Sequence, residues 1–326
     1  MFKGIREQWR ALEDCVVRPP RAEYTERELV GGRSGKFAVG LASGKREDYD
    51  ITNKRGQTLK CSYYKPSMRG TPTELPCVVY CHCNSGSRVD ANEVVGMLVP
   101  QGIAVFALDF AGSGNSDGEH VTLGVDEVDD VEVVVAWLRE KKKASHIGMW
   151  GRSMGAVVCL LYGKRDPTIA GIVLDSPFAS LVSLMEELAA SHKLLTGFLT
   201  KPLISILRRS IRKRANFDIL KANPLKAVSS SFIPALFGHG KEDDFVAFKH
   251  SERLYEAYAG DKNLISFDGG HNSPRPDFFH TSVLIFFMNV LGPLSAGSPS
   301  PVRRTGSPNT IPDEVLLQEA LALSLT

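Results

Sequence analysis

The sequence contains no apolar run long enough to cross a membrane. Its longest apolar stretch, residues 282–291, falls well short of the roughly 20 residues that a transmembrane helix needs. The first residues are charged and lack the apolar core of a secretory signal. No asparagine lies in an Asn-X-Ser/Thr glycosylation site. These absences predict a protein of the reducing cytoplasm.

Cysteine and excess charge are scarce as well. The six cysteines lie mostly in apolar runs, where free buried thiols are the expected state. Cys81-His82-Cys83 has no second ligand pair at zinc spacing, so we predict no metal site. The net charge is only +2 at pH 7, which indicates no charged partner and gives no sign of nucleic-acid binding.

Residues 2–17 carry apolar side chains at steps of three and four, which indicates one face of a helix. This face comprises Phe2, Ile5, Trp9, Leu12 and Val16. We expect it to pack on the protein's own domain. The alternative is peripheral contact with a membrane.

From residue 46 onward, strand-like and helix-like segments alternate. Residues 46–53 and 58–66 predict an antiparallel hairpin. Further buried strands are predicted at 76–83, 103–110, 146–151, 170–176, 232–238 and 263–269, with helices near 91–100, 124–142, 154–165, 246–259 and 277–291. This order predicts an α/β fold with a mostly parallel, eight-stranded sheet that helices cover on both faces. Ligands of such sheets bind at the carboxyl ends of the strands.

One connection between strands is much longer than the others. It joins Asp175 to Phe232 and contains two helical patterns, so we expect a lid over the site at about 179–231. Basic residues gather at its centre, at Arg208, Arg209, Arg212, Lys213 and Arg214. We interpret them as a solvated helix face. The alternative is a surface for anionic head groups, a membrane or a phosphate-bearing acyl carrier.

The segment Gly151-Arg152-Ser153-Met154-Gly155 stands between an apolar strand and an apolar helix. A Gly-X-Ser-X-Gly sequence in this setting predicts a tight turn that exposes Ser153 above the sheet as a nucleophile. Residues 114–118 match the same pattern, but no apolar helix follows them directly. We interpret that second match as a glycine-rich turn.

A serine nucleophile needs a histidine base and a carboxylate that orients the base. His271 follows the last predicted strand and is the candidate base. Asp243, in the loop after residues 232–238, is the preferred acid, with Asp244 and Asp175 as alternatives. All of these residues lie just past strand ends, so they can converge at one edge of the sheet.

The oxyanion of the reaction intermediate needs preorganised donors, usually two backbone N–H groups. Met154, directly after the nucleophile, is the first candidate. Asn84, in the loop that follows residues 76–83, is the second.

These segments resemble the α/β-hydrolase superfamily, of the serine aminopeptidase and monoglyceride-lipase-like type, and within it a group of cytosolic hydrolases common in plants and protists. The resemblance rests on residues 18–24, 78–88, 108–118, 148–157, 232–240 and 259–276. It implies a Ser153–His271–Asp243 triad, an oxyanion hole of the Asn84 and Met154 amides, and no metal or cofactor. The family's oxyanion loop usually reads His-Gly-Asn, whereas Cys83 replaces the glycine here. If that position requires a positive φ, Cys83 would be strained.

The expected activity is that of a serine hydrolase that cleaves an ester or thioester of a small molecule or an acylated protein. A serine peptidase is the runner-up. A weakly catalytic adaptor that binds ubiquitin is the alternative from another class of function.

The adaptor alternative depends on the end of the chain. Residues 293–312 are rich in proline and serine and predict a disordered linker. Residues 313–326 resemble a ubiquitin-interacting motif, with Leu317, Ala320 and Ser324 at the expected spacing. The chain is thus predicted to comprise an N-terminal helix (1–22), a hydrolase domain (23–292), this linker and this short helix.

Overall fold

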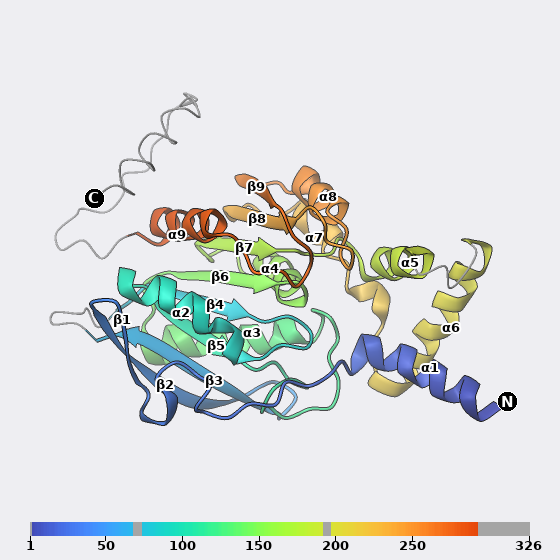
Figure 1. The fold of residues 1–326 in the computed structure, drawn as a ribbon, viewed down its shortest axis with the longest axis horizontal. Coiled ribbons are helices and arrows are strands. Elements are labelled where there is room, and N and C mark those ends of the chain that lie inside the picture. The colour runs from blue at the N-terminus through green and yellow to red at the C-terminus, as the bar shows by residue number, and fades with distance from the viewer. Residues whose placement is uncertain (1, 68–73, 192–196, 293–326) are drawn as a thin grey trace. The chain divides into compact units, whose positions relative to one another are not determined.

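The computed structural model of the protein describes residues 2–67, 74–191 and 197–292. Within these ranges the strands form one sheet in the order β1-β2-β3-β5-β4-β6-β7-β8-β9 (Figure 1). The strands are β1 (Lys36–Val39), β2 (Ala42–Thr52), β3 (Thr58–Pro66), β4 (Cys77–Cys81), β5 (Ala104–Leu108), β6 (Ile147–Arg152), β7 (Gly171–Asp175), β8 (Ala235–Gly240) and β9 (Lys262–Phe267).

The sheet has an antiparallel edge and a parallel body. β1 to β3 pair antiparallel with one another, and β3 pairs antiparallel with β5. The remaining pairs, from β5 through β4 to β9, are all parallel. Every residue of β4, β5 and β7 is buried, as expected where helices cover both faces.

The predicted number of strands was wrong, because the described residues contain nine strands in the sheet rather than eight. The additional strand is β1, which has only four residues and pairs with the start of β2 across a turn at Gly40. A strand this short carries too little apolar alternation to be recognised from sequence.

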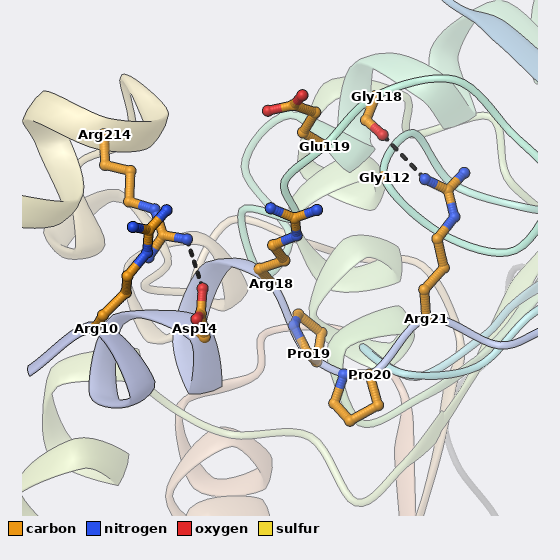
Figure 2. A pocket seen from close by; sticks show the side chains of 10 residues that line it. All are labelled: Arg10, Asp14, Arg18, Pro19, Pro20, Arg21, Gly112, Gly118, Glu119 and Arg214. Carbon is orange, nitrogen blue, oxygen red and sulfur yellow. Dashed lines mark hydrogen bonds and ion pairs between the residues drawn. The ribbon is translucent and has the colours of Figure 1, made fainter. Parts of the chain in front are cut away.

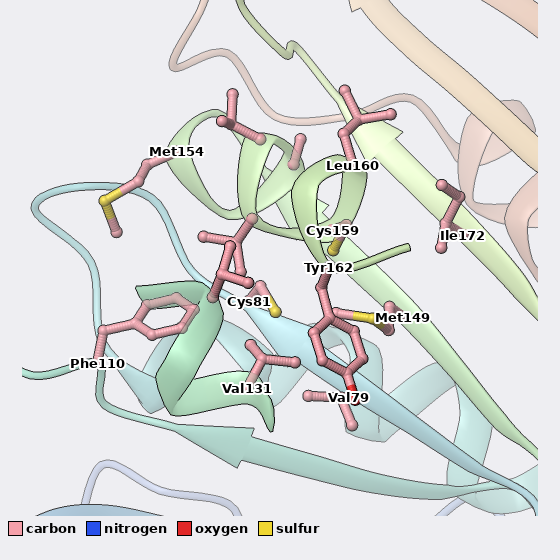
Figure 3. Packing of buried hydrophobic residues seen from close by; sticks show 14 of the residues in the cluster. Val79, Cys81, Phe110, Val131, Met149, Met154, Cys159, Leu160, Tyr162 and Ile172 are labelled. Atoms are coloured by element: carbon pink, nitrogen blue, oxygen red, sulfur yellow. The ribbon is translucent and has the colours of Figure 1, made fainter. Parts of the chain in front are cut away.

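Helices cover both faces of the sheet, and others lie beyond the carboxyl ends of its strands (Figure 1). They are α1 (Phe2–Val17), α2 (Asn92–Leu98), α3 (Glu127–Trp137), α4 (Met154–Arg165), α5 (Leu181–Ser191), α6 (Gly197–Ala215), α7 (Leu225–Val228), α8 (Lys249–Ala257) and α9 (Asp277–Leu291). Side chains of α2 and α9 form one buried core with the sheet, and side chains of α3, α4 and α8 form the other. In the second core, Cys159 and Tyr162 of α4 pack with Val79 and Met149 of the strands below (Figure 3).

The long connection between β7 and β8 contains α5 and α6, which lie beyond the carboxyl ends of the strands together with α1 (Figure 1). α1 packs against α6: the Trp9 indole donates to Ser210 Oγ at 3.2 Å, and Arg214 forms ion pairs with Glu13 and Asp14. Val16, near the end of α1, is buried in the core. The N-terminal helix therefore packs on its own domain.

Three of the basic residues of α6 are paired within the chain, and one of them is Arg212, whose Nη1 lies 4.0 Å from Asp218 Oδ2. Arg208 donates two hydrogen bonds to Asp218, at 2.7 and 2.6 Å, and Arg214 binds the acids of α1. Arg209 and Lys213 are exposed, and neither has an ion-pair partner among the described residues. None of the helices described is long and apolar enough to span a bilayer. The predicted linker at 293–312 and short helix at 313–326 lie outside the described residues.

Candidate active site

Ser153 occupies a tight turn between β6 and α4. Its φ of 53° and ψ of −114° lie in a region that residues with a side chain rarely adopt. The turn is held by hydrogen bonds from the Ser153 N–H to the Asp175 carbonyl at 2.7 Å and from the Ala156 N–H to the Ser153 carbonyl at 3.0 Å. This backbone places Ser153 at the carboxyl end of β6, next to the end of β7.

The two glycines of the turn permit a close approach of backbone to backbone. A Cβ atom at Gly151 would lie 2.2 Å from the Gly155 carbonyl oxygen, and one at Gly155 would lie 1.9 Å from the Cys81 carbonyl oxygen. Both distances are impossible for real atoms, so any side chain at either position would displace α4 from β4 and β6. The second Gly-X-Ser-X-Gly segment, at 114–118, forms a turn with no helix behind it, as its sequence setting indicates.

The structure brings Ser153, His271 and Asp243 together. His271 Nε2 lies 3.1 Å from Ser153 Oγ, and His271 Nδ1 lies 2.7 Å from Asp243 Oδ2. An ionised carboxylate only accepts hydrogen bonds, so Nδ1 carries the proton and Nε2 is free to accept from the serine hydroxyl. The His271 side chain is 10% exposed and that of Asp243 is fully buried.

Hydrogen bonds keep Asp243 ionised in spite of its burial. Burial by itself would raise the pKa of Asp243, but hydrogen bonds from His239 and His271, the charge of His271 and the Val246 amide outweigh it. The pKa of this carboxyl group is therefore held well below its usual range. Asp243 Oδ1 also accepts the Phe245 N–H at 3.1 Å and the Val246 N–H at 2.7 Å.

His239 is a second buried histidine beside Asp243, and its contact with that carboxylate was not predicted from the sequence. Its Nε2 lies 2.7 Å from the Val246 carbonyl oxygen and 3.3 Å from Asp243 Oδ2. Because a carbonyl only accepts, Nε2 carries a proton, while Nδ1 lies 2.6 Å from Ser251 Oγ. His239 therefore fixes the loop that carries Asp243 and supplies that carboxylate with a further N–H.

The alternative acids lie elsewhere. Asp244 is exposed and has no hydrogen-bond or ion-pair partner among the described residues. Asp175 is buried, but it pairs with Arg275, whose Nε and Nη2 lie 2.9 and 2.7 Å from its carboxylate oxygens. The charge of Asp175 is thereby satisfied away from His271.

Two arginines hold the backbone of His271, and neither was predicted from the sequence. Arg152 Nη2 donates to the His271 carbonyl at 2.9 Å, and Arg275 Nη2 donates to the same oxygen at 3.2 Å. Arg275 also donates to the Ser273 carbonyl at 2.9 Å. The buried Arg275–Asp175 pair thus ties the His271 loop to the end of β7, next to Ser153.

The two predicted oxyanion donors, Asn84 and Met154, line the same cavity as Ser153. Met154 is the first residue of α4, so its N–H has no partner within the helix. Neither backbone N–H donates to any residue in the described part of the chain. Both amides are therefore available to an oxygen atom bound near Ser153.

Cys83 is not strained. The residues with positive φ other than glycine are Leu123, Lys143, Ser153, Ser176 and Asn216 in the described ranges, so Cys83 adopts an ordinary backbone. The neighbouring His82 is fully buried, accepts the Phe110 N–H at 3.1 Å and contacts the Cys83 carbonyl at 2.6 Å. His82 thereby shapes the loop, and all six cysteines are free.

An apolar cavity of about 710 Å³ opens at Ser153. α1, α5 and α6 form most of its wall, and the side chains that line it include Leu12, Cys15, Val16, Leu123, Phe178, Leu181, Leu184, Met185, Leu203, Ile204, Leu207 and Phe245. The contribution of α1 was not anticipated from the sequence. The cavity can hold an apolar group whose reactive atom lies at Ser153.

The sheet order and its flanking helices form the α/β-hydrolase fold, which confirms the predicted fold class. A family profile described as serine aminopeptidase, S33, matches residues 75–227. The chain is 23% identical to a solved esterase from Pyrococcus furiosus, with a TM-score of 0.64 over 85% of this chain and 99% of that one.

Two curated relatives extend the comparison. An uncharacterised Bacillus subtilis protein, YqkD, is 28% identical over 69% of this chain and 77% of its own length. Mouse monoglyceride lipase is 32% identical over 54% of this chain and 59% of its own length.

Proposed function

We propose that the protein is a serine hydrolase that cleaves carboxylic esters or thioesters of medium or long acyl chains. The observation that carries this proposal is the continuous hydrogen-bonded series Ser153–His271–Asp243 at the mouth of an apolar cavity. The likeness to solved esterases and to a monoglyceride lipase points in the same direction.

In the proposed reaction, Ser153 Oγ attacks the carbonyl carbon while its proton passes to His271 Nε2. Asp243 stabilises the imidazolium that forms and keeps it oriented. The carbon–oxygen or carbon–sulfur bond then breaks, and the leaving group takes the proton from His271. Water then attacks the acyl carbon while His271 takes its proton. The bond to Ser153 Oγ breaks, Ser153 receives the proton from His271, and the carboxylic acid is released.

The negative charge of the tetrahedral intermediate would be bound by the Asn84 and Met154 amides. Each such donor contributes on the order of 3 kcal/mol to lowering the barrier. The dipole of α4, which begins at Met154, adds positive potential at the same place.

The apolar wall supports an acyl chain as the group bound next to Ser153. A cavity of about 710 Å³ lies within the usual range for small-molecule sites. Because α5 and α6 form much of this wall, we further propose that residues 179–231 act as a lid. Binding of an acyl chain by this wall would exclude water from the reacting ester.

A fluorophosphonate probe tests the catalytic assignment. We expect the folded protein to be labelled and Ser153→Ala to remain unlabelled, because the probe reacts with an activated serine. Ser205→Ala, at an exposed position of α6, is the matched control and should be labelled as the wild type is. A folded wild-type protein without labelling would contradict the proposal and favour a non-catalytic adaptor.

A serine peptidase is the second candidate, favoured by the description of the matching family profile as serine aminopeptidase. A comparison of p-nitrophenyl esters of rising length, acyl thioesters and aminoacyl p-nitroanilides separates the two. Ester hydrolysis should exceed anilide hydrolysis by a large factor, since an apolar wall at Ser153 disfavours a charged amino terminus.

A further inference from the structure

A second cavity, of about 450 Å³, lies against the polar face of α1 (Figure 2). Its walls come from α1, from residues 18–21, from the loop that carries Gly112 and Glu119, and from the end of α6. It is lined by Arg10, Asp14, Arg18, Pro19, Pro20, Arg21, Gly112, Gly118, Glu119 and Arg214. We call it the α1 basic pocket. Four arginines and two acids line it, and Glu13, which pairs with Arg214, brings the formal charge of this group to about +1.

Two of these arginines are held by the protein itself. Arg21 donates to the Gly114 carbonyl at 2.6 Å and to the Gly118 carbonyl at 3.0 Å, so it clamps the glycine-rich turn and keeps its charge. Arg214 forms ion pairs with Glu13 and Asp14. These contacts fix two walls of the pocket without a ligand.

The side chains of the other two arginines are unpaired in the described part of the chain. Arg10 and Arg18 form no hydrogen bond or ion pair through their side chains with any residue that the structure describes. Asp14, the acid that lies between them on α1, is already bound by Arg214 at its carboxylate. Glu119, the remaining acid, is exposed. Two uncompensated guanidinium groups therefore face the same cavity.

The charges around this pocket also act on a neighbouring histidine. The pKa of His120 is lowered, first by burial and then by the charge of Arg214, with a smaller contribution from Arg18. Glu119 and Asp14 act on this pKa in the opposite direction.

We propose that the α1 basic pocket binds the phosphoryl group of a phosphomonoester, with Arg10 and Arg18 as its principal ligands. A phosphomonoester carries close to two negative charges near pH 7 and presents three acceptor oxygens. Guanidinium groups donate in pairs to such oxygens, which makes arginine the preferred residue for phosphate recognition. The charge of the ligand matches that of the two unpaired guanidinium groups of Arg10 and Arg18, and a carboxylate would neutralise only half of it. The phosphoryl group can belong to a free metabolite or to a lipid head group.

This pocket and the cavity at Ser153 share α1 but use opposite faces of it. Leu12, Cys15 and Val16 line the apolar cavity, whereas Arg10 and Asp14 line the basic pocket. Trp9 lies one residue before Arg10 and donates to Glu13 and Ser210. Binding at Arg10 therefore takes place next to a tryptophan whose fluorescence can report it.

The test uses the full chain with Ser153→Ala, so that no turnover accompanies binding and failure of the proposed hydrolase activity does not affect the result. Glycerol 3-phosphate is titrated at fixed ionic strength, with calorimetry and tryptophan fluorescence as readouts. A second arm measures sedimentation with phosphatidylcholine vesicles that either contain or lack phosphatidic acid. The variant Arg10→Ala/Arg18→Ala removes the proposed ligands. Arg209→Ala/Lys213→Ala removes the same charge from an exposed face of α6 and is the matched control.

We expect saturable binding of glycerol 3-phosphate, of phosphatidic-acid vesicles or of both, and at least tenfold weaker binding in the Arg10/Arg18 variant only. Binding of the soluble compound alone identifies a free ligand, and binding of the vesicles alone identifies a head group. Absence of both, or equal weakening in the control variant, overturns the proposal. Thermal unfolding should show both double variants folded, because the replaced side chains form no ion pair in the described structure.

Discussion

At the scale of single residues, the site depends on a few side chains whose surroundings fix their chemical state. Ser153 is held in an unusual backbone conformation by Gly151 and Gly155, which bear no side chain to prevent the close approach of α4. Asp243 stays ionised because donors surround it, and these hold its pKa low. The strained backbone at Ser153 lowers the free energy of unfolding. It persists because the surrounding contacts hold the residue in this conformation.

The first prediction concerns Asp243. Replacement by Asn keeps the shape of the side chain but offers His271 Nδ1 an amide in place of a carboxylate, so the imidazole loses its proper tautomer and its stabilising charge. We expect kcat for a p-nitrophenyl ester to fall by about 10⁴-fold, which is the loss that follows when the carboxylate of such a triad is replaced by an amide. Steady-state kinetics with circular dichroism as a folding check measures this.

Asp244→Asn is the matched control, since Asp244 is adjacent and exposed. Its kcat should stay within about twofold of the wild type, because exposed substitutions away from a site have small effects. A larger loss in Asp244→Asn than in Asp243→Asn would show that the acid was assigned to the wrong residue.

At the scale of elements, α1 has two faces with different tasks. One face contributes Leu12, Cys15 and Val16 to the apolar cavity, and the other contributes Arg10 and Asp14 to the α1 basic pocket. Its apolar periodicity predicted a helix, and the structure has that helix at Phe2–Val17. The surface that it packs against could not be predicted, because α6 lies about two hundred residues further along the chain.

The second prediction follows from the position of Leu12 on the cavity wall. Leu12→Trp places a larger side chain in the cavity and leaves less room there for a long acyl chain. We expect kcat/KM for long-chain p-nitrophenyl esters to fall roughly tenfold relative to the acetate ester. A chain-length series with wild type and variant gives the measurement.

Ile206→Trp serves as the control for this series. Ile206 lies on α6 and is 55% exposed, and it does not line the cavity. The same side chain placed there should leave the chain-length preference unchanged. An equal shift in both variants would mean that α1 does not limit the acyl group.

At the scale of the whole molecule, loops from distant parts of the chain meet at one edge of the sheet. Ser153 follows β6, Asp243 follows β8 and His271 follows β9. Parallel strands bring their carboxyl ends to the same edge, so the order of elements is sufficient to bring the three loops together. The Arg275–Asp175 pair then locks the last of these loops to β7.

The third prediction concerns the segment at 313–326, which lies outside the described residues. If it is a ubiquitin-interacting motif, the full chain should bind ubiquitin, and Ala320→Gln with Ser324→Ala should weaken that binding at least tenfold. Calorimetry with monoubiquitin measures the effect. Thr305→Ala with Ser307→Ala, in the preceding linker, is the control. Binding that persists unchanged in the Ala320/Ser324 variant would exclude the motif.

The sequence by itself determined the class of fold and the loops that bear the site. Buried strands and amphipathic helices are predicted from the spacing of their apolar residues. The glycines around Ser153 indicate a tight turn that few other residues permit. These properties are local, because each depends only on residues that are close together in the sequence. The sequence could not place β1, which is too short to show a pattern, and it left three aspartates open as the acid.

Only the tertiary structure showed that Asp243 contacts His271 while Asp175 pairs with Arg275 and Asp244 is exposed, because these contacts depend on where each loop lies in the fold. It also revealed His239 behind the acid, Arg152 and Arg275 on the His271 carbonyl, and α1 on the cavity wall. Each of these contacts joins residues that are far apart along the chain or point in directions that spacing alone does not define. Side-chain partners across a fold are decided by packing, and packing is a property of the folded molecule.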